Sequence, residues 1–282
     1  MKNVLTIDLE DWYQGIELSP PVWGKYEDRV EWHVFKLLEI LDAQKTKATF
    51  FVLGYVARKY PSLIKEIADA GHEIGSHGYG HQLVYTLEPE AFVFDLKRSV
   101  HELEQIIGQP VQSYRAPYFS ITRKSLWALD ILAAHGITRD SSISPIYNYR
   151  YGIPDAPKYM HEIQTSHGSL LEIPPTAISW FGRCFSMTGG FYFRFFPYYL
   201  MKHAIQRMNQ AGHPAVVYLH PWELDPDQPR LKLPPRISLT HYYNLRNTER
   251  KLNILLRDFE FVPSCEVASQ PQNLTSIRYD EN

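Results

Sequence analysis

The sequence predicts an α/β fold built on a mostly parallel sheet, and two observations lead to this prediction. Short apolar runs of strand length alternate along the chain with longer segments whose apolar residues recur at helical spacing. Such alternation is typical of units in which helices connect parallel strands. In addition, 44% of the 282 residues are hydrophobic and 21% are charged, as in globular chains with a substantial core.

The first half of the chain alternates regularly. The expected strands are residues 4–9, 48–53, 72–76, 112–115 and 137–139. The expected helices are residues 27–44, a segment that ends at 70, and residues 89–107 and 123–135. A glycine follows three of these helices, at Gly71, Gly108 and Gly136, where glycine commonly ends a helix.

The second half begins with a looser pattern. Between about residues 144 and 196, Pro, Gly, Tyr and Phe are frequent, and one strand is expected near 169–173. Regular alternation then resumes. It comprises a helix at 197–210, a strand at 215–219, a helix at 240–258 and a strand at 261–263. Since the first and last strands belong to one unit, we expect a single domain over residues 1–282 with an irregular insertion at about 144–196.

Composition and charge exclude several kinds of partner. The net charge is -2 without any basic block, which argues against nucleic acid as a partner. No apolar run reaches 18 residues, so no transmembrane segment is expected. The N-terminus is too short and too acidic for a signal peptide, and Cys184 and Cys265 stand far apart, as in a reducing compartment. These features predict a cytoplasmic protein and leave a homo-oligomer open.

Two histidines follow the expected third strand at a spacing that suits a metal. His77 and His81 stand four residues apart, so both can reach one ion. Alone, this pair is weak evidence, because such spacing is common in ordinary helices. Gly78 and Gly80 favour a tight turn over a packed helix face, which strengthens the prediction of a metal site.

Three acids close the first strand. Residues i and i+2 of a strand point to the same face, so Asp8 and Glu10 are expected to face a pocket together. Asp11 joins them only if the strand has already turned. A metal site needs an anionic ligand beside the histidines and an open position for water. Alone, the three acids would more often form a solvated loop.

Two further strand ends carry reactive residue types. Arg115 stands in Arg-Ala-Pro-Tyr, which ends with Tyr118, and an arginine here can clamp a carboxylate. His220 ends the strand at 215–219, two residues before Trp222. Four strand ends that are far apart in the sequence thus carry the residue types that metal-assisted amide hydrolysis requires. They supply metal ligands, a base for water, an arginine that orients the base, and a histidine that protonates the leaving amine.

With these motifs in order, the sequence resembles the polysaccharide deacetylase family, also called NodB-homology or carbohydrate esterase family 4. The resemblance implies a deformed (β/α)7-type barrel. It also implies that Asp8 is the catalytic base, that Arg115 orients it, and that His220 is the general acid. The backbone N–H of Tyr118 would help to hold the oxyanion, and Asp140, in Arg-Asp-Ser-Ser, would support this machinery. The family's paired aspartates are Asp-Leu-Glu-Asp here, so Glu10 and Asp11 both remain candidate metal ligands.

Asp-Leu-Glu-Asp-Trp-Tyr at residues 8–13 and Tyr-Leu-His-Pro-Trp-Glu-Leu-Asp at residues 218–225 further resemble a subgroup from bacterial exopolysaccharide and exosortase (PEP-CTERM) loci. This resemblance implies that the substrate is an N-acetylated precursor, either a cytoplasmic sugar nucleotide or a lipid-linked sugar. Trp12, Tyr118 and Trp222 are candidates for a sugar-binding wall, and Arg183 and Arg194 for contact with a phosphate. The ligand types favour Zn²⁺, although Co²⁺, Ni²⁺ and Fe²⁺ suit them as well. Two alternatives remain: an allantoinase-like hydrolase of a small non-sugar amide, and a non-catalytic carbohydrate-binding module.

Overall fold

The computed structural model describes residues 1–16, 18, 20–180, 183–269 and 274–279. Its main sheet follows the order β10-β1-β2-β3-β4-β5-β7-β6-β12, and β11 also pairs with β1. The strands foreseen from the sequence are β1 Asn3–Leu9, β2 Thr49–Val52, β3 Glu73–Ser76, β4 Ser113–Tyr114, β5 Arg139–Asp140, β7 Gly168–Glu172, β10 Val216–Leu219 and β11 Phe261–Val262. Every pairing in this sheet is parallel except the β6–β7 pairing.

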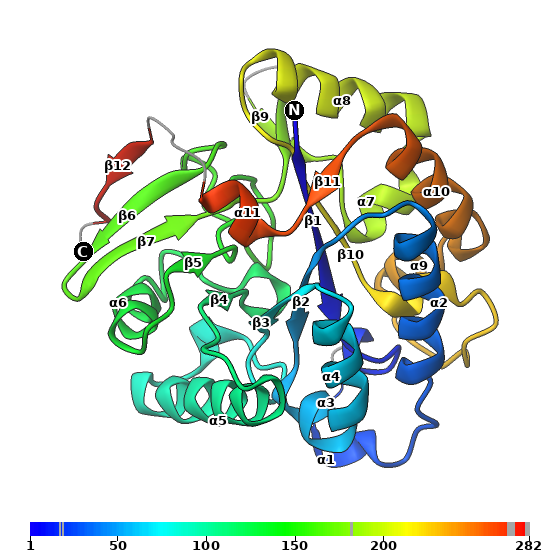
Figure 1. The fold of residues 1–282 in the computed structure, drawn as a ribbon, viewed down its shortest axis with the longest axis horizontal. Helices are drawn as coiled ribbons and strands as arrows, with labels where there is room; N and C mark the ends of the chain where they lie inside the picture. Colours follow the sequence, from blue (N-terminus) through cyan, green and yellow to red (C-terminus); the bar gives the residue numbers. More distant parts are fainter. Residues whose placement is uncertain (17, 19, 181–182, 270–273, 280–282) are drawn as a thin grey trace.

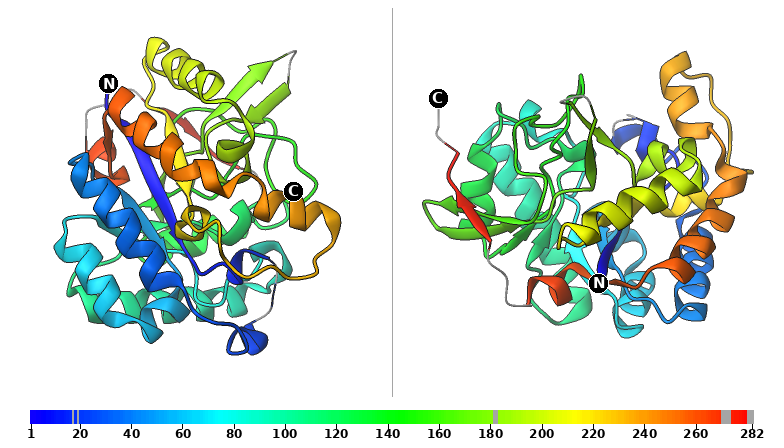
Figure 2. Two further views of the ribbon diagram at one scale, coloured as in Figure 1. Left: turned by 90° about the vertical axis from the view of Figure 1, so that its right-hand side faces the viewer. Right: turned by 90° about the horizontal axis from the view of Figure 1, so that it is seen from above.

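Helices surround the strands on the outside (Figures 1 and 2). They are α1 Pro20–Trp23, α2 Val30–Ala43, α3 Gly54–Lys59, α4 Pro61–Asp69, α5 Pro89–Ile107, α6 Trp127–Ala134, α7 Gly190–Phe195, α8 Tyr198–Gln210, α9 Pro235–Tyr242, α10 Thr248–Asp258 and α11 Ser264–Ala268. Among the described residues, five short 3₁₀ turns precede helices, namely η1 Gln14–Ile16, η2 Val84–Thr86, η3 Pro117–Phe119, η4 Pro221–Leu224 and η5 Leu245–Asn247. The path of the sheet stays open between β10 and β12, so the architecture is a deformed α/β barrel.

The largest apolar core lies between β1 and β2 and the helices that cover them. Leu5 and Ile7 of β1 are fully buried there with Val34 and Leu41 of α2 and Leu252 of α10. All seven residues of β1 are buried, as expected of a central parallel strand with helices around it. This packing fixes the direction of β1 and therefore the place where its acidic end emerges.

Residues 144–196 are more regular than the sequence predicted. Beyond the expected β7, they contain β6 His161–Thr165, β8 Ala177–Trp180 and β9 Arg183–Ser186. The β6–β7 hairpin extends the main sheet, and β12 Thr275–Ile277 adds a further strand beside β6. A single domain over the whole chain stays a prediction.

The helix expected at 240–258 is in fact two helices. α9 ends at Tyr242, η5 follows, and α10 begins at Thr248. Asn244 between them has a φ of 56°, a left-handed conformation that no α-helix can continue through. The apolar spacing on both sides of this break resembled one continuous helix.

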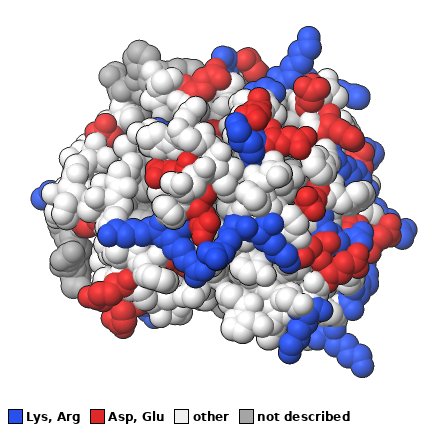
Figure 3. Space-filling model, turned by 60° about the horizontal axis from the view of Figure 1, so that its bottom comes forward, with Lys and Arg blue, Asp and Glu red and all other residues white. Residues whose placement is uncertain are grey.

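Charges are interspersed on the molecular surface. On the face shown in Figure 3, a row of basic side chains crosses the surface with acidic and uncharged ones beside it. This distribution accords with a net charge of -2. Among the described residues, no helix combines the length and the hydropathy needed to cross a bilayer.

Candidate metal-dependent active site

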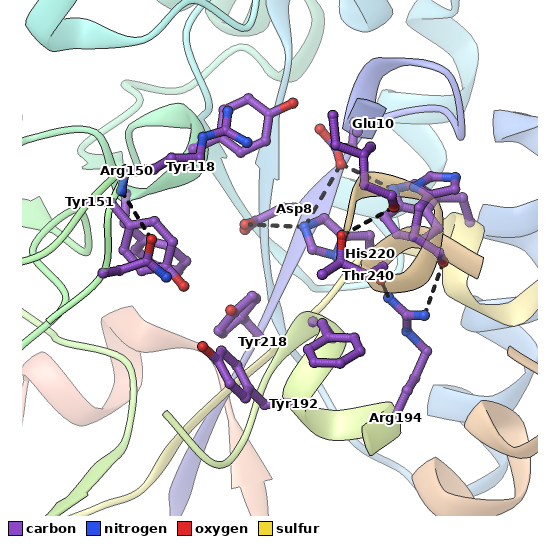
Figure 4. A pocket seen from close by; sticks show the side chains of 18 of the residues that line it. Asp8, Glu10, Tyr118, Arg150, Tyr151, Tyr192, Arg194, Tyr218, His220 and Thr240 are labelled. Atoms are coloured by element: carbon purple, nitrogen blue, oxygen red, sulfur yellow. Dashed lines mark hydrogen bonds and ion pairs between the residues drawn. The ribbon is translucent and has the colours of Figure 1, made fainter. Parts of the chain in front are cut away.

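The carboxyl ends of β1, β3, β4 and β10 surround one cavity of about 420 Å³. Asp8 lies in β1, His77 directly follows β3, and His220 directly follows β10. These strands run parallel, so their carboxyl ends meet at the same edge, where open α/β sheets commonly bind ligands. In Figure 4, Asp8 lies between Glu10 and His220 on one side and Tyr118 on the other.

Glu10, His77 and His81 form the group that could hold a metal. One ligand atom from each lies within 4.8 Å of the others. Glu10 Oε2 is 2.8 Å from His81 Nε2, yet no hydrogen-bond donor satisfies this buried oxygen in the described structure. Two imidazoles with one carboxylate are a ligand set of catalytic zinc sites. The residues therefore fit a divalent cation of the zinc type.

His77 is prepared to act as a neutral ligand. Its Nδ1 lies 2.8 Å from the carbonyl oxygen of Arg115, which makes Nδ1 the protonated donor and leaves Nε2 with a lone pair. Burial lowers the pKa of His77 to about 4. The imidazole is thus uncharged at neutral pH, as metal binding requires.

The two histidines lie on a tight turn and not on a helix, as the flanking glycines indicated. Asp95 on α5 accepts hydrogen bonds from the backbone N–H groups of Tyr79 and Gly80 at 2.7 and 3.1 Å. Gly78 has a φ of 71°, and a Cβ there would come within 2.8 Å of an Asp95 oxygen. His81 itself has a φ of 53°, a conformation uncommon for non-glycine residues and frequent at functional sites.

Asp11 was a candidate metal ligand, and the structure places it elsewhere. Its Oδ2 accepts hydrogen bonds from the backbone N–H groups of Arg29 and Val30 at 2.8 and 3.0 Å. Its Oδ1 accepts the N–H of Trp12. The carboxylate therefore serves the start of α2, because the chain has turned after Glu10. Trp12, a candidate for the sugar wall, is also buried away from the cavity, with Nε1 donating to the carbonyl of Glu27.

Arg115 holds Asp8 in place. Its Nη1 donates to Asp8 Oδ1 at 2.7 Å and to the hydroxyl of Thr6 at 2.8 Å. Its Nη2 donates to the hydroxyl of Ser141 at 2.7 Å. The guanidinium is fully buried, so these contacts leave it little freedom. One oxygen of Asp8 is thereby fixed, while Oδ2 faces His220.

His220 is held by Glu223, a residue that sequence reasoning missed. His220 Nδ1 is 2.8 Å from Glu223 Oε1, and Nε2 lies 3.7 Å from Glu10 Oε1 and 3.9 Å from Asp8 Oδ2. Burial opposes a charge on His220, but the Glu223 hydrogen bond and the nearby carboxylates raise its pKa to about 9. A carboxylate three residues after a strand-end histidine was the available signal.

Arg194 was a candidate for phosphate contact, and the structure places it in the lining of the cavity with its guanidinium bonded to groups of the fold. The side chain is buried, and Nε donates to Glu223 Oε2 at 2.5 Å. Its other nitrogens donate to the backbone carbonyls of Thr240, His241 and Tyr243. The guanidinium is thus committed within the fold. The side chain of Arg183 lies outside the described structure.

Trp222 and Tyr118 both line the cavity, as expected. Trp222 stacks on His220, with ring centroids 5.1 Å apart, and its Nε1 donates to Glu10 Oε1 at 3.0 Å. The ring of Tyr118 lies 4.7 Å from that of His81. Tyr118 and Phe119 have φ values of 55° and 53°, so the Arg-Ala-Pro-Tyr motif also ends in a left-handed conformation.

Asp140 lies apart from the other predicted site residues. It is buried beside Glu172, its neighbour across the β5–β7 pairing, and does not line the cavity. The Ser142 hydroxyl, which accepts the backbone N–H of Ala116, donates to Asp140. Asp140 therefore contacts the motif around Arg115 through Ser142 and through its pairing with Tyr114, and His220 is held by Glu223.

Comparison with known proteins gives matches to both halves of the chain. The polysaccharide deacetylase family profile matches residues 19–138, and that of a domain of unknown function (DUF3473) matches residues 141–269. A peptidoglycan-N-acetylglucosamine deacetylase of Bacillus cereus is 29% identical over 118 residues, which are 38% of this chain and 43% of the relative. A peptidoglycan deacetylase of Helicobacter pylori is 30% identical over 110 residues, or 38% of this chain and 36% of the relative. These matches thus span about two fifths of the relatives' own length.

A solved structure shares the whole architecture. A structure from Mycobacterium smegmatis assigned to the polysaccharide deacetylases superposes with a TM-score of 0.64 and 21% identity, covering 96% of this chain and 92% of the other. At this identity the likeness concerns the fold, and it agrees with the barrel-like sheet described above. Residues 19–138 thus match the polysaccharide deacetylase family, and the fold of the chain resembles that of the Mycobacterium smegmatis structure.

Proposed function

We propose that this chain is a metal-dependent hydrolase that removes the N-acetyl group from an N-acetylated sugar. The observation that carries the proposal is the meeting of three functional groups in one cavity. They are the Glu10-His77-His81 group, the Asp8–Arg115 pair and His220. The named activities of the relatives, all removals of acetyl groups from glycans, support it.

Each side chain has a task that its position supports. Glu10, His77 and His81 would hold the cation, which would supply Lewis acidity toward the acetyl carbonyl when bound. Asp8, oriented by Arg115, accepts the proton of the attacking water. His220 Nε2 lies 3.9 Å from Asp8 Oδ2 and donates a proton to the departing amine. Base and acid thus lie side by side in the lining of the cavity.

Glu223 and Trp222 position this machinery. Glu223 accepts a hydrogen bond from the Nδ1–H of His220, so that Nε2 faces the cavity. Trp222 donates to Glu10 Oε1, which leaves Oε2 toward the histidines. In metal sites, hydrogen bonds from neighbouring groups to the ligands commonly fix the orientation of those ligands.

The size of the cavity supports a short substrate. Its volume is about 420 Å³, and residues of the 148–151 segment and of α7 form part of its wall. Cavities of this size commonly enclose one small ligand. We therefore favour an N-acetylated sugar precursor over a long polymer. The same partial cover also favours the second candidate, hydrolysis of a small non-sugar amide.

The proposal is tested by acetate release from N-acetylated sugars and from small amides, with and without a chelator. We expect bound divalent metal in the purified protein and loss of acetate release after chelation. His77→Ala should lower kcat/KM by more than about 100-fold, since even indirect contacts to a ligand account for 10- to 100-fold. His203→Ala, an exposed histidine on α8, is the matched control. Full activity of His77→Ala together with a metal-free protein would refute the proposal.

A further inference from the structure

The cavity continues beyond the metal group into a region that the proposed reaction does not use. This outer region is formed by the segment 148–151 and by residues of α9. Each supplies one arginine to the lining, Arg150 and Arg236 respectively. Two cations thus come from separate parts of the chain to the lining of one cavity.

Arg150 lies one aromatic ring away from the metal group. Its Cζ is 4.2 Å from the centroid of the Tyr118 ring, and that ring is 4.7 Å from the ring of His81. Figure 4 shows Arg150 beside Tyr118 on the wall opposite His220. A group held near Arg150 would therefore adjoin a substrate whose acetamide lies at Asp8.

Arg236 reaches the same region from α9. Its Cζ lies 3.7 Å from the centroid of the Tyr149 ring, and Tyr149 is the chain neighbour of Arg150. Stacking occupies the face of a guanidinium and leaves its N–H edge available for hydrogen bonds. Within the described parts of the chain, no carboxylate forms an ion pair with the exposed guanidinium of Arg236. Arg194, in contrast, is neutralised by Glu223.

The acidic and the basic side chains of the cavity therefore lie in different parts of its lining. Of the described residues that line it, the acids are Asp8 and Glu10, both at the inner end. Asp8 is paired with Arg115, and Glu10 lies against His81. Among the described lining residues, the outer region carries two arginines and no acid. A neutral sugar offers no charge to Arg236, whereas an oxyanion forms charge-assisted hydrogen bonds with a guanidinium edge.

We propose that Arg236, together with Arg150, binds an oxyanion carried by the substrate, a phosphate or a carboxylate attached beside the N-acetylated sugar ring. This inference rests on the proposed N-deacetylase function and narrows it to anionic sugars. Arginine suits both groups, because its planar fork matches phosphate and carboxylate oxygens bidentately.

The test compares kcat/KM for acetate release from four N-acetylglucosamine compounds. They are its anomeric phosphate, its uridine diphosphate derivative, its disaccharide with glucuronic acid, and the neutral di-N-acetylated disaccharide. We expect an anionic compound to be preferred, and Arg236→Gln to lower the ratio of anionic to neutral kcat/KM roughly tenfold, the loss of about one charged hydrogen bond. Added salt should reduce the same ratio. The phosphate and glucuronate arms distinguish the two sources of the oxyanion.

Arg230→Gln is the matched control, because Arg230 also stacks on a tyrosine, at 4.9 Å from the Tyr242 ring, but does not line the cavity. An equal ratio in wild type, Arg236→Gln and Arg230→Gln would overturn the inference while acetate release keeps the proposed function intact. If wild type releases no acetate from any compound, the proposed function has failed. Calorimetric titration with the uridine diphosphate sugar then tests Arg236 independently, and equal affinity of wild type and Arg236→Gln overturns its role.

Discussion

At the scale of single residues, the neighbouring acids Glu10 and Asp11 have different roles in the structure. The carboxylate of Glu10 lies against His81 inside the cavity. The carboxylate of Asp11 accepts backbone N–H groups at the start of α2, which carries a partial positive charge. The first carboxylate is placed to bind a cation, and the second stabilises a helix.

This division predicts different outcomes for two neighbouring substitutions. Glu10→Gln should lower metal affinity by more than about 100-fold, since it removes a proposed anionic ligand. Asp11→Ala should keep the metal but reduce the free energy of unfolding by about 1–2 kcal/mol, because it removes the cap of α2. Metal titration and urea denaturation of both variants measure the two effects. Loss of metal in Asp11→Ala at unchanged stability would contradict the assignment.

At the scale of elements, Arg194 lines the cavity and connects three segments there. It projects from α7, pairs with Glu223 of η4, and donates to carbonyls at the end of α9. The same Glu223 carboxylate accepts the hydrogen bond from Nδ1 of His220. The orientation of His220 therefore depends on how α7 and α9 pack on η4.

We expect Arg194→Met to destabilise the fold by about 3–5 kcal/mol, because removal of one partner of a buried ion pair leaves the other without compensation. Glu223→Gln in the same chain should recover part of this loss, so that the double variant is more stable than the sum of the single variants predicts. Urea denaturation of the four proteins gives the coupling energy. Strict additivity would show that the pair does not act as a unit.

At the scale of the whole molecule, a pair of carboxyl groups connects the parallel and antiparallel parts of the sheet. Asp140 of β5 and Glu172 of β7 are register neighbours, and both are buried. Burial raises the pKa of Asp140 to about 6, and burial together with the neighbouring Asp140 carboxylate raises the pKa of Glu172 well above its usual value. One of the two groups therefore keeps its proton in the folded state.

We expect the contribution of Asp140 and Glu172 to the free energy of unfolding to fall as the pH rises. Above the usual pKa values of 3.8 and 4.5 the unfolded chain has lost these protons, whereas the folded chain keeps them up to about pH 6 and beyond. The folded state then binds more protons, so the free energy of unfolding decreases with increasing pH. Glu172→Gln retains a hydrogen-bond donor without this titration, and its stability relative to wild type should increase from about pH 5 to about pH 8.

Denaturation curves at several pH values measure this difference. Buried histidines such as His72 and His241, whose pKa values burial lowers, titrate in both proteins, so their contribution cancels in the comparison. A stability difference that does not change with pH would show that the pair is ionised in the folded state.

Much of the fold could be predicted from local sequence. The expected helix at 89–107 coincides with α5, because its apolar spacing is regular and Pro89 and Gly108 mark its ends. The expected helix at 240–258 was wrong in part, since one residue with positive φ, Asn244, outweighs the propensities around it. Strands β6, β8, β9 and β12 were missed, because their sequences lack the long apolar runs of buried parallel strands.

What the sequence determined by itself is the set of strand-end side chains that meet in the cavity. Asp8, His77, Arg115 and His220 each lie at the carboxyl end of a strand expected from the sequence or directly follow one, and parallel strands bring such ends together. Tertiary structure alone decided between Glu10 and Asp11, gave His220 its partner Glu223, committed Arg194 to the fold, and brought Arg150 and Arg236 to one cavity. These outcomes depend on where a turn, a helix end or a distant segment places a side chain, which local sequence does not encode.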